Sequence, residues 1–103
     1  DRLPKYSFIG HSHLTQSFIV TRKGVQNITG GTTTPGRDEK VIITAGSVGQ
    51  PRDRNPNSCF VLLDTDSGEY AFHRVPYEIP TAAGKIEDAG LSKRFAQRLY
   101  EGA

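Results

Sequence analysis

Two histidines separated by one residue are the chemically most suggestive feature of the chain. They lie in the stretch Gly10-His11-Ser12-His13, directly after a short apolar run. Neutral imidazole is a common ligand for zinc and other first-row divalent metals. In an extended strand the two rings would point to the same side, whereas in a turn they would converge from a tight backbone. Gly10 permits a sharp bend and Ser12 is small, so a metal site is one interpretation of the pattern. Taken alone, the motif favours the alternative of two exposed loop histidines.

A second candidate is the glycine-rich segment TAGSVGQPRD, from Thr44 to Asp53. It follows an apolar run that is typical of a buried strand, and it contains Gly46, Ser47 and Arg52. Glycines allow backbone N–H groups to face an anion, and a guanidinium group can bind two phosphate oxygens at once. A phosphate-binding loop is therefore one interpretation of the segment. Taken alone, the segment favours an ordinary connection between strands, in which Arg52 binds nearby carbonyl groups.

The remaining reactive side chains favour structural roles. His73 has no histidine or carboxylate at ligand spacing and is expected to be a structural or surface residue. Asp64 and Asp66 belong to DTDSG, which is typical of a turn rather than of paired catalytic carboxylates. Cys59 is the single cysteine and lies in the apolar run CFVLL. It predicts a buried thiol, no internal disulfide and a reducing, cytoplasmic compartment.

Length and composition restrict the classes of partner. The 103 residues suffice for one small domain, and 35% hydrophobic and 23% charged residues are typical of a globular protein. A net charge of +2 is too small to predict a nucleic-acid surface. Lys93, Arg94 and Arg98 are expected on a solvated helix face. No apolar run is long enough to cross a bilayer. The small net charge and the lack of such a run mean that neither nucleic acid nor membrane is predicted as a partner.

The elements that position these residues follow from hydrophobic period and turn signals. About five strands are expected, and they lie at residues 6–10, 17–24, 40–46, 58–65 and 69–75. Residues 25–40 are polar and rich in glycine and threonine, which predicts a long loop or a loosely held hairpin. The runs at 40–46 and 58–65 are almost continuously apolar, which is typical of strands covered on both faces.

The end of the chain changes to a helical period. Pro80 and Gly90 bracket the first helical segment, in positions typical of a first turn and a C-terminal cap. In the next segment Leu91, Phe95 and Leu99 are spaced four residues apart and are expected on one helical face. The sequence therefore predicts about five strands followed by two short C-terminal helices.

Taken together, four stretches resemble the C-terminal part of the calcineurin-like metallophosphoesterases. They are FIGHSH, ITAGSVGQPRDRNPNSCFVLLD, EYAFHRVPYEI and AGLSKRFAQRLYEG. The resemblance runs from about Tyr6 to Gly102 and is closest to a bacterial group with a GSVGQPRD loop. It implies an α/β (α+β) fold, in which residues 1–103 are the C-terminal half of a two-sheet β-sandwich flanked by helices.

The resemblance also implies an activity, a metal-dependent phosphoester hydrolase that acts as a phosphatase or phosphodiesterase. In that family the GHxH segment supplies two ligands to a dinuclear centre, so His11 would bind one divalent ion and His13 the other. Manganese, iron and zinc are the candidate ions, and two-metal chemistry activates a water that attacks phosphorus. Gly46, Ser47 and Arg52 match the loop beside the metals, where Arg52 would face the phosphate or order the loop.

The family's other metal-ligand motifs, DxH, GDxxD and GNH[DE], do not occur in residues 1–103. The chain is therefore expected to be part of a longer domain and to be inactive alone. Its apolar face and strand edge would be covered by the missing N-terminal half or, alternatively, by a second copy in a homodimer. The substrate stays open among phosphoproteins, nucleotides and phosphodiesters.

Two further interpretations of the sequence stay open. One is a small, cupin-like, all-β metal-binding domain, although such a site uses a glutamate where LTQSF offers only Gln16. The other is a non-catalytic module that binds phosphate through the glycine-rich loop.

Overall fold

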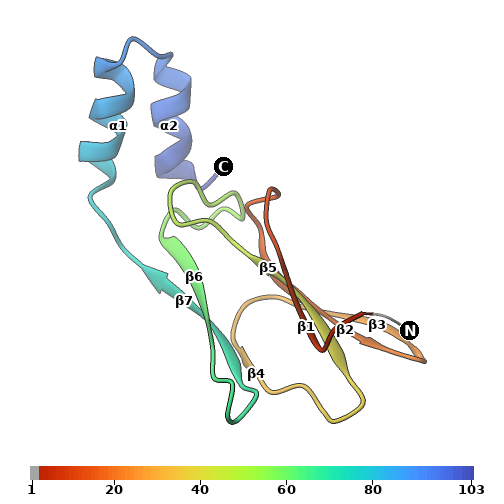
Figure 1. Cartoon of the computed structure of the whole chain (residues 1–103). Helices are drawn as coiled ribbons and strands as arrows, with labels where there is room; N and C mark the ends of the chain where they lie inside the picture. Colours follow the sequence, from red (N-terminus) through yellow and green to blue (C-terminus); the bar gives the residue numbers. More distant parts are fainter. Residues whose placement is uncertain (1–2) are drawn as a thin grey trace.

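The computed structural model describes residues 3–103, which form seven strands and two helices. The strands are β1 (Tyr6–Ile9), β2 (Thr15–Thr21), β3 (Gly24–Ile28), β4 (Thr32–Thr33), β5 (Lys40–Ala45), β6 (Ser58–Leu63) and β7 (Tyr70–Val75). The helices are α1 (Ile79–Asp88) and α2 (Lys93–Glu101), and both follow the last strand (Figure 1). The predicted mixed α+β class with two C-terminal helices is confirmed.

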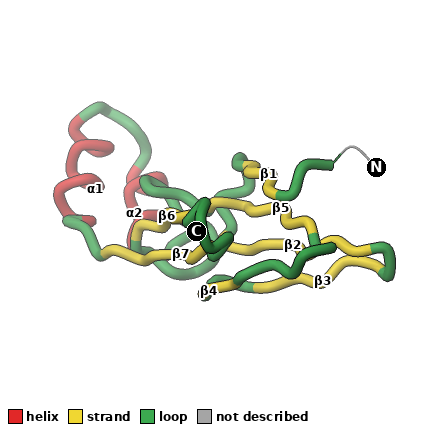
Figure 2. Tube along the Cα trace, turned by 60° about the horizontal axis from the view of Figure 1, so that its bottom comes forward, coloured by secondary structure: helices red, strands yellow, loops and turns green. Residues whose placement is uncertain are grey.

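The strands form two sheets. Sheet A has the order β1-β5-β2-β3, and sheet B has the order β4-β7-β6. Strand β1 is parallel to β5, and the other strand pairs are antiparallel. Figure 2 shows that both helices lie beyond one end of the sheets rather than over a sheet face.

The core lies between the inner faces of the two sheets. Ile19, Val41 and Ile43 of sheet A contact Tyr70 of sheet B. The ladder places Ile19 opposite Val41, and a strand turns alternate side chains to opposite faces, so these residues share one face. The Tyr70 hydroxyl is buried but hydrogen-bonds the Ser17 hydroxyl at 2.8 Å. This bond offsets the cost of burying both polar groups.

The glycine- and threonine-rich segment is more ordered than the sequence indicates. It contains β3, which forms a hairpin with β2, and the short strand β4, which pairs with β7. Gly30 and Gly31 lie between β3 and β4 with φ angles of 64° and 77°, a backbone conformation that favours glycine. They allow the chain to pass from sheet A to sheet B. Strand β3 is mostly exposed, and its residues do not alternate between apolar and polar. The sequence therefore contains no hydrophobic pattern that predicts this strand.

The prediction that residues 58–65 are covered on both faces is wrong. Cys59 and Val61 of β6 turn inward, whereas Phe60 and Leu62 are 36% and 58% exposed. An apolar run predicts the need for cover on both faces. It does not say whether the neighbouring chain segment provides that cover.

The DTDSG segment forms the turn that the sequence predicts. The Asp64 carboxylate accepts hydrogen bonds from the backbone N–H groups of Asp66 at 2.9 Å and Ser67 at 3.2 Å. These bonds, with the one from Ser67 contributing most, hold the pKa of Asp64 below its usual value. Asp64 therefore has a structural role, as expected.

The two helices form a hairpin with a small core of its own, made by Ala83, Ala96 and Leu99. Of the three residues expected on one helical face, only Leu99 is buried. Leu91 precedes α2, and both Leu91 and Phe95 are exposed. The spacing is helical, but within residues 3–103 no neighbouring element covers that side of the hairpin.

The basic residues of α2 divide into two groups. Lys93 and Arg94 are exposed, as expected for a solvated face. Arg98 is half-buried and donates from Nε to the carbonyl of Ala103 at 3.1 Å, so it stabilises the end of the helix. Among residues 3–103, neither helix has the length and apolar character needed to cross a membrane.

Candidate functional site

The two histidines lie in the turn between β1 and β2. Both have left-handed backbone conformations, with φ angles of 77° for His11 and 61° for His13. The turn alternative is therefore correct, and the extended one is wrong. Gly10 is not in the left-handed region, so the histidines themselves make the bend. Such a conformation costs about 1–3 kcal/mol for a residue with a side chain, and it persists at sites where surrounding contacts hold it.

The ring of His13 is oriented by the glycine-rich loop. Its Nδ1 lies 2.7 Å from the carbonyl oxygen of Gln50. A carbonyl oxygen can only accept, so Nδ1 carries the proton and the neutral ring keeps a lone pair on Nε2. Metal-ligating histidines commonly donate their other ring N–H to such a carbonyl, which fixes the ligating atom. The geometry therefore suits Nε2 of His13 as a metal ligand.

A second hydrogen bond joins the same two segments. The backbone N–H of Arg52 donates to the carbonyl of His13 at 3.1 Å. The turn and the loop are thus connected on both sides of Pro51, which is fully buried. The structure brings together the two motifs that the sequence singles out, which lie far apart along the chain.

The glycine-rich loop folds tightly against the start of β2. Gly46 has a φ of 81°, and a Cβ atom there would lie 2.8 Å from Cys59 Sγ and 2.9 Å from Thr15 Oγ1. The Ser47 hydroxyl accepts the N–H of Gln50 at 2.8 Å. Gly46 and Ser47 therefore shape the loop and position Gln50 beneath His13. Their contacts account for these residue types without a ligand.

Replacement of Gly46 by alanine is expected to destabilise the protein by about 3 kcal/mol, because left-handed strain adds to overlap with two buried neighbours. Gly31 is the matched control, since it has a φ of 77° and open space around a Cβ position. Gly31→Ala should cost only about 1–2 kcal/mol, the strain alone. Urea unfolding measures both values. Equal destabilisation by the two substitutions would contradict the close packing at Gly46.

Arg52 projects from the same loop and is exposed. Its Nη2 donates to the side-chain oxygen of Gln50 at 3.3 Å, so part of the guanidinium helps to order the loop. The other N–H groups of a guanidinium remain able to bind an anion. The structure is therefore compatible with both roles that the sequence suggests for this residue.

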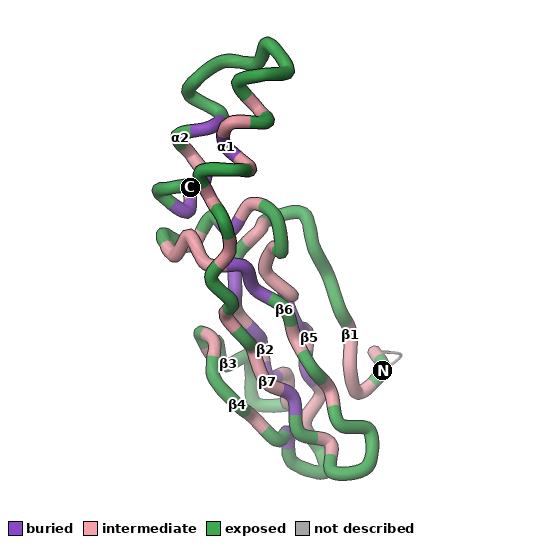
Figure 3. The backbone as a smooth tube through the Cα atoms, turned by 90° about the vertical axis from the view of Figure 1, so that its left-hand side faces the viewer, coloured by how far each residue is buried: buried purple, intermediate pink, exposed green. Residues whose placement is uncertain are grey.

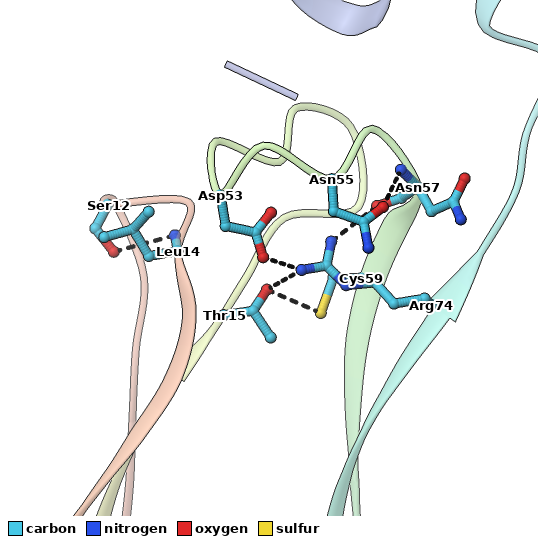
Figure 4. Close-up of polar contacts among 8 residues, drawn as sticks. All are labelled: Ser12, Leu14, Thr15, Asp53, Asn55, Asn57, Cys59 and Arg74. Carbon is cyan, nitrogen blue, oxygen red and sulfur yellow. Dashed lines mark hydrogen bonds and ion pairs between the residues drawn. The ribbon is translucent and has the colours of Figure 1, made fainter. Parts of the chain in front are cut away.

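A half-buried ion pair below the loop was not predicted. Figure 4 shows Arg74 of β7 directed toward Asp53, with Thr15 beside them. Arg74 donates to Asp53, to the Thr15 hydroxyl at 2.9 Å and to the carbonyl of Asn57 at 3.0 Å. These bonds tie the glycine-rich loop to both sheets. The available signal was the strand alternation, which puts Arg74 on the inner side with two aromatic residues, where a charge requires a partner.

The remaining reactive side chains lie away from this arrangement or are buried. His73 is exposed on the outer face of sheet B, where it stacks on Phe60 with ring centroids 5.2 Å apart. Cys59 is buried and has a free thiol. Both observations confirm the expected structural roles.

The described residues do not form a complete metal site by themselves. Within residues 3–103, no three His, Cys, Asp or Glu side chains are grouped so that they could hold an ion. Two imidazoles are suitable donors, and the His13 ring is already oriented, but a divalent ion needs about four or more ligands. His11 and His13 therefore fit a metal centre to which other groups must also contribute.

Comparison with known proteins finds a sequence relative and a structural neighbour. The chain is 33% identical over 95 residues to the uncharacterized protein MJ0912 of Methanocaldococcus jannaschii, covering 92% of this chain and 38% of that protein. It superimposes on a metallophosphoesterase from Sphaerobacter thermophilus with a TM-score of 0.81 and 26% identity, covering 96% of this chain and 42% of that one. No protein-family model matches the chain.

The chain thus spans about two fifths of the length of both proteins. The all-β, cupin-like interpretation is wrong, because two helices form the end of the fold and the neighbour is a metallophosphoesterase. The two sheets and the two C-terminal helices of residues 3–103 therefore have the fold of part of a metallophosphoesterase.

Proposed function

We propose that the chain is the C-terminal portion of a single metallophosphoesterase domain and that the complete protein is a metal-dependent phosphoester hydrolase. The observation that carries the proposal is the hydrogen bond between His13 Nδ1 and the Gln50 carbonyl at 2.7 Å. It joins the predicted metal ligand to the predicted phosphate loop in a fold similar to that of a metallophosphoesterase.

The two histidines would each hold one divalent ion, with manganese, iron and zinc as candidates. When bound, a pair of such ions supplies Lewis acidity and an activated water for attack on phosphorus. His13 would bind through Nε2, because its Nδ1 is directed at Gln50. His11 is exposed in the same turn and is accessible for the second ion.

Arg52 would bind the phosphate oxygens of the substrate. Its backbone N–H is bonded to the carbonyl of His13, so its side chain starts beside the histidine turn. A guanidinium binds phosphate through two parallel hydrogen bonds and offsets its charge. Gly46 and Ser47 would contribute by shaping the loop that presents Arg52.

The proposed partners are a phosphoester substrate and the remainder of the domain, with a homodimer as the alternative cover for the apolar surface. We place the protein in the cytoplasm, a location that the buried free thiol of Cys59 supports. A non-catalytic phosphate-binding module is the second candidate function. The exposed guanidinium of Arg52 and the small number of metal donors in residues 3–103 favour it.

The test compares the complete protein encoded by the gene with residues 1–103 alone. With Mn²⁺, the complete protein should hydrolyse p-nitrophenyl phosphate or bis(p-nitrophenyl) phosphate. Chelation should lower the rate by more than about a hundredfold, since even loss of an outer-shell partner costs ~10–100-fold at metal sites. Residues 1–103 alone should show no turnover above the metal-only background.

Two results would count against the proposal. Turnover by residues 1–103 alone would show that the two histidines suffice and that the site has been misjudged. Phosphate binding by the complete protein without bound metal or hydrolysis would favour the non-catalytic module.

A further inference from the structure

Strand β1 is one of the two edge strands of sheet A among the described residues, yet it has the features of an interior strand. It pairs in parallel with β5 along its whole length. Phe8 and Ile9 follow each other and are 50% and 49% exposed, so β1 presents an apolar side chain on each face of the sheet. Parallel strands with apolar residues on both faces normally lie inside a sheet that is covered on both sides.

The backbone register identifies the unpaired groups of β1. The N–H of Val41 in β5 donates to the carbonyl of Lys5 at 2.8 Å. In a parallel ladder each residue turns its N–H and C=O to the same side, and successive residues alternate. Lys5, Ser7 and Ile9 therefore direct their backbone N–H and C=O groups toward β5. Tyr6 and Phe8 direct theirs to the outer edge of the sheet. Within residues 3–103 those groups have no partner, so the edge can accept another strand.

The shape of the molecule is consistent with a missing neighbour. Its extents are 50 × 23 × 19 Å and its radius of gyration is 16.2 Å, against about 13 Å for a compact domain of this length. Figure 3 shows β1 along an outer side of the molecule. Because the chain covers 38% and 42% of the two similar proteins, about three fifths of each lies outside the matched part.

We propose that the outer edge of β1 pairs in parallel with a strand from the part of the same protein that lies outside residues 1–103. Such a strand would bond the backbone groups of Tyr6 and Phe8, and its flanking segments would cover Phe8 and Ile9. The inference rests on the proposed function only in treating the chain as part of a longer domain.

Parallel pairing has a consequence for the candidate site. The carboxyl ends of parallel strands lie at the same edge of a sheet. The carboxyl end of β1 leads directly into the turn that carries His11 and His13. Residues that follow the added strand would therefore lie beside the two histidines, where further metal ligands are needed. An antiparallel strand would bring its amino end there instead.

Amide hydrogen exchange by NMR tests the pairing directly. In the complete protein, the amides of Tyr6 and Phe8 should exchange at least about a hundredfold more slowly than in residues 1–103 alone. The Ser7 amide is the internal control, because it faces β5 and should be protected in both samples. Equal exchange of Tyr6 and Phe8 in the two samples would overturn the inference.

Self-pairing has its own signature. A two-fold dimer would pair β1 antiparallel with its copy, so residues 1–103 alone would show protection of Tyr6 and Phe8 that is lost on dilution. That result would also overturn the inference. Metal content and hydrolysis are measured on the same complete protein. Protection without activity would therefore reject the proposed function alone, and activity without protection would reject the strand pairing alone.

Discussion

Replacing His11 by glycine in the complete protein should lower metal-dependent phosphoester hydrolysis by more than about a hundredfold and leave the fold intact. His11 has a φ of 77°, is exposed and makes no hydrogen bond to any other residue of the described part. Glycine adopts this conformation without strain. The substitution should therefore change the free energy of unfolding by less than about 1 kcal/mol. Glycine removes the backbone strain of the folded state, and this gain is offset because glycine gives the unfolded chain more conformational entropy to lose on folding.

His13→Ala should lower activity by a similar factor but should also cost stability, because it removes the bond to the Gln50 carbonyl. His73→Ala is the matched control, since it removes the third histidine from the outer face of sheet B, where it stacks on Phe60. Steady-state kinetics and bound-metal analysis on all three variants separate the roles. Full activity of His11→Gly, or equal loss in His73→Ala, would remove the basis for the metal site.

Replacing Gly102 by alanine should destabilise the complete protein by about 3–5 kcal/mol, a large part of the stability of a typical domain. Gly102 ends α2 in the left-handed conformation with a φ of 65°. An added Cβ would lie 2.7 Å from both the backbone N and C of Asn55. Backbone atoms cannot rotate aside as a side chain can, so the helix end or the loop would have to move.

Gly90 provides the matched control, because it has a φ of 80° and nothing within 4 Å of a Cβ position. Gly90→Ala should cost only about 1–2 kcal/mol, which is the strain of the left-handed backbone. Urea denaturation of the two variants gives the difference. A difference of less than about 1 kcal/mol would show that the contact between Gly102 and Asn55 is loose.

The contact at Gly102 also joins the helical hairpin to the candidate site. The carbonyl of Gly102 accepts the N–H of Arg54 at 2.8 Å. Arg54 directly follows Arg52, whose guanidinium is exposed, and Asp53, which forms the ion pair with Arg74. Arg54 itself has a φ of 68°. The loop is thus held by the histidine turn at one side and by the end of α2 at the other. Loss of this anchor should disorder the loop as well as the helices.

Much of the fold follows from the sequence by itself. Local chemistry determines the turn at Asp64, the start of α1 near Pro80 and the left-handed ends at Gly90 and Gly102. These features depend on residues a few positions apart, and such interactions leave a readable pattern in the order of the amino acids.

The tertiary structure decided the features that join distant parts of the chain. His13 and Gln50 are 37 positions apart, and Arg74 and Thr15 are 59 positions apart. Two further features also depend on contacts between distant parts of the chain. They are the pairing of β4 with β7 and the exposed outer face of β6. A sequence motif names the side chains that can do chemistry, but their orientation depends on which carbonyl or carboxylate the fold brings beside them. Those partners are set by the pairing of strands, because backbone hydrogen bonds are formed by every residue type and leave no mark of their own in the sequence.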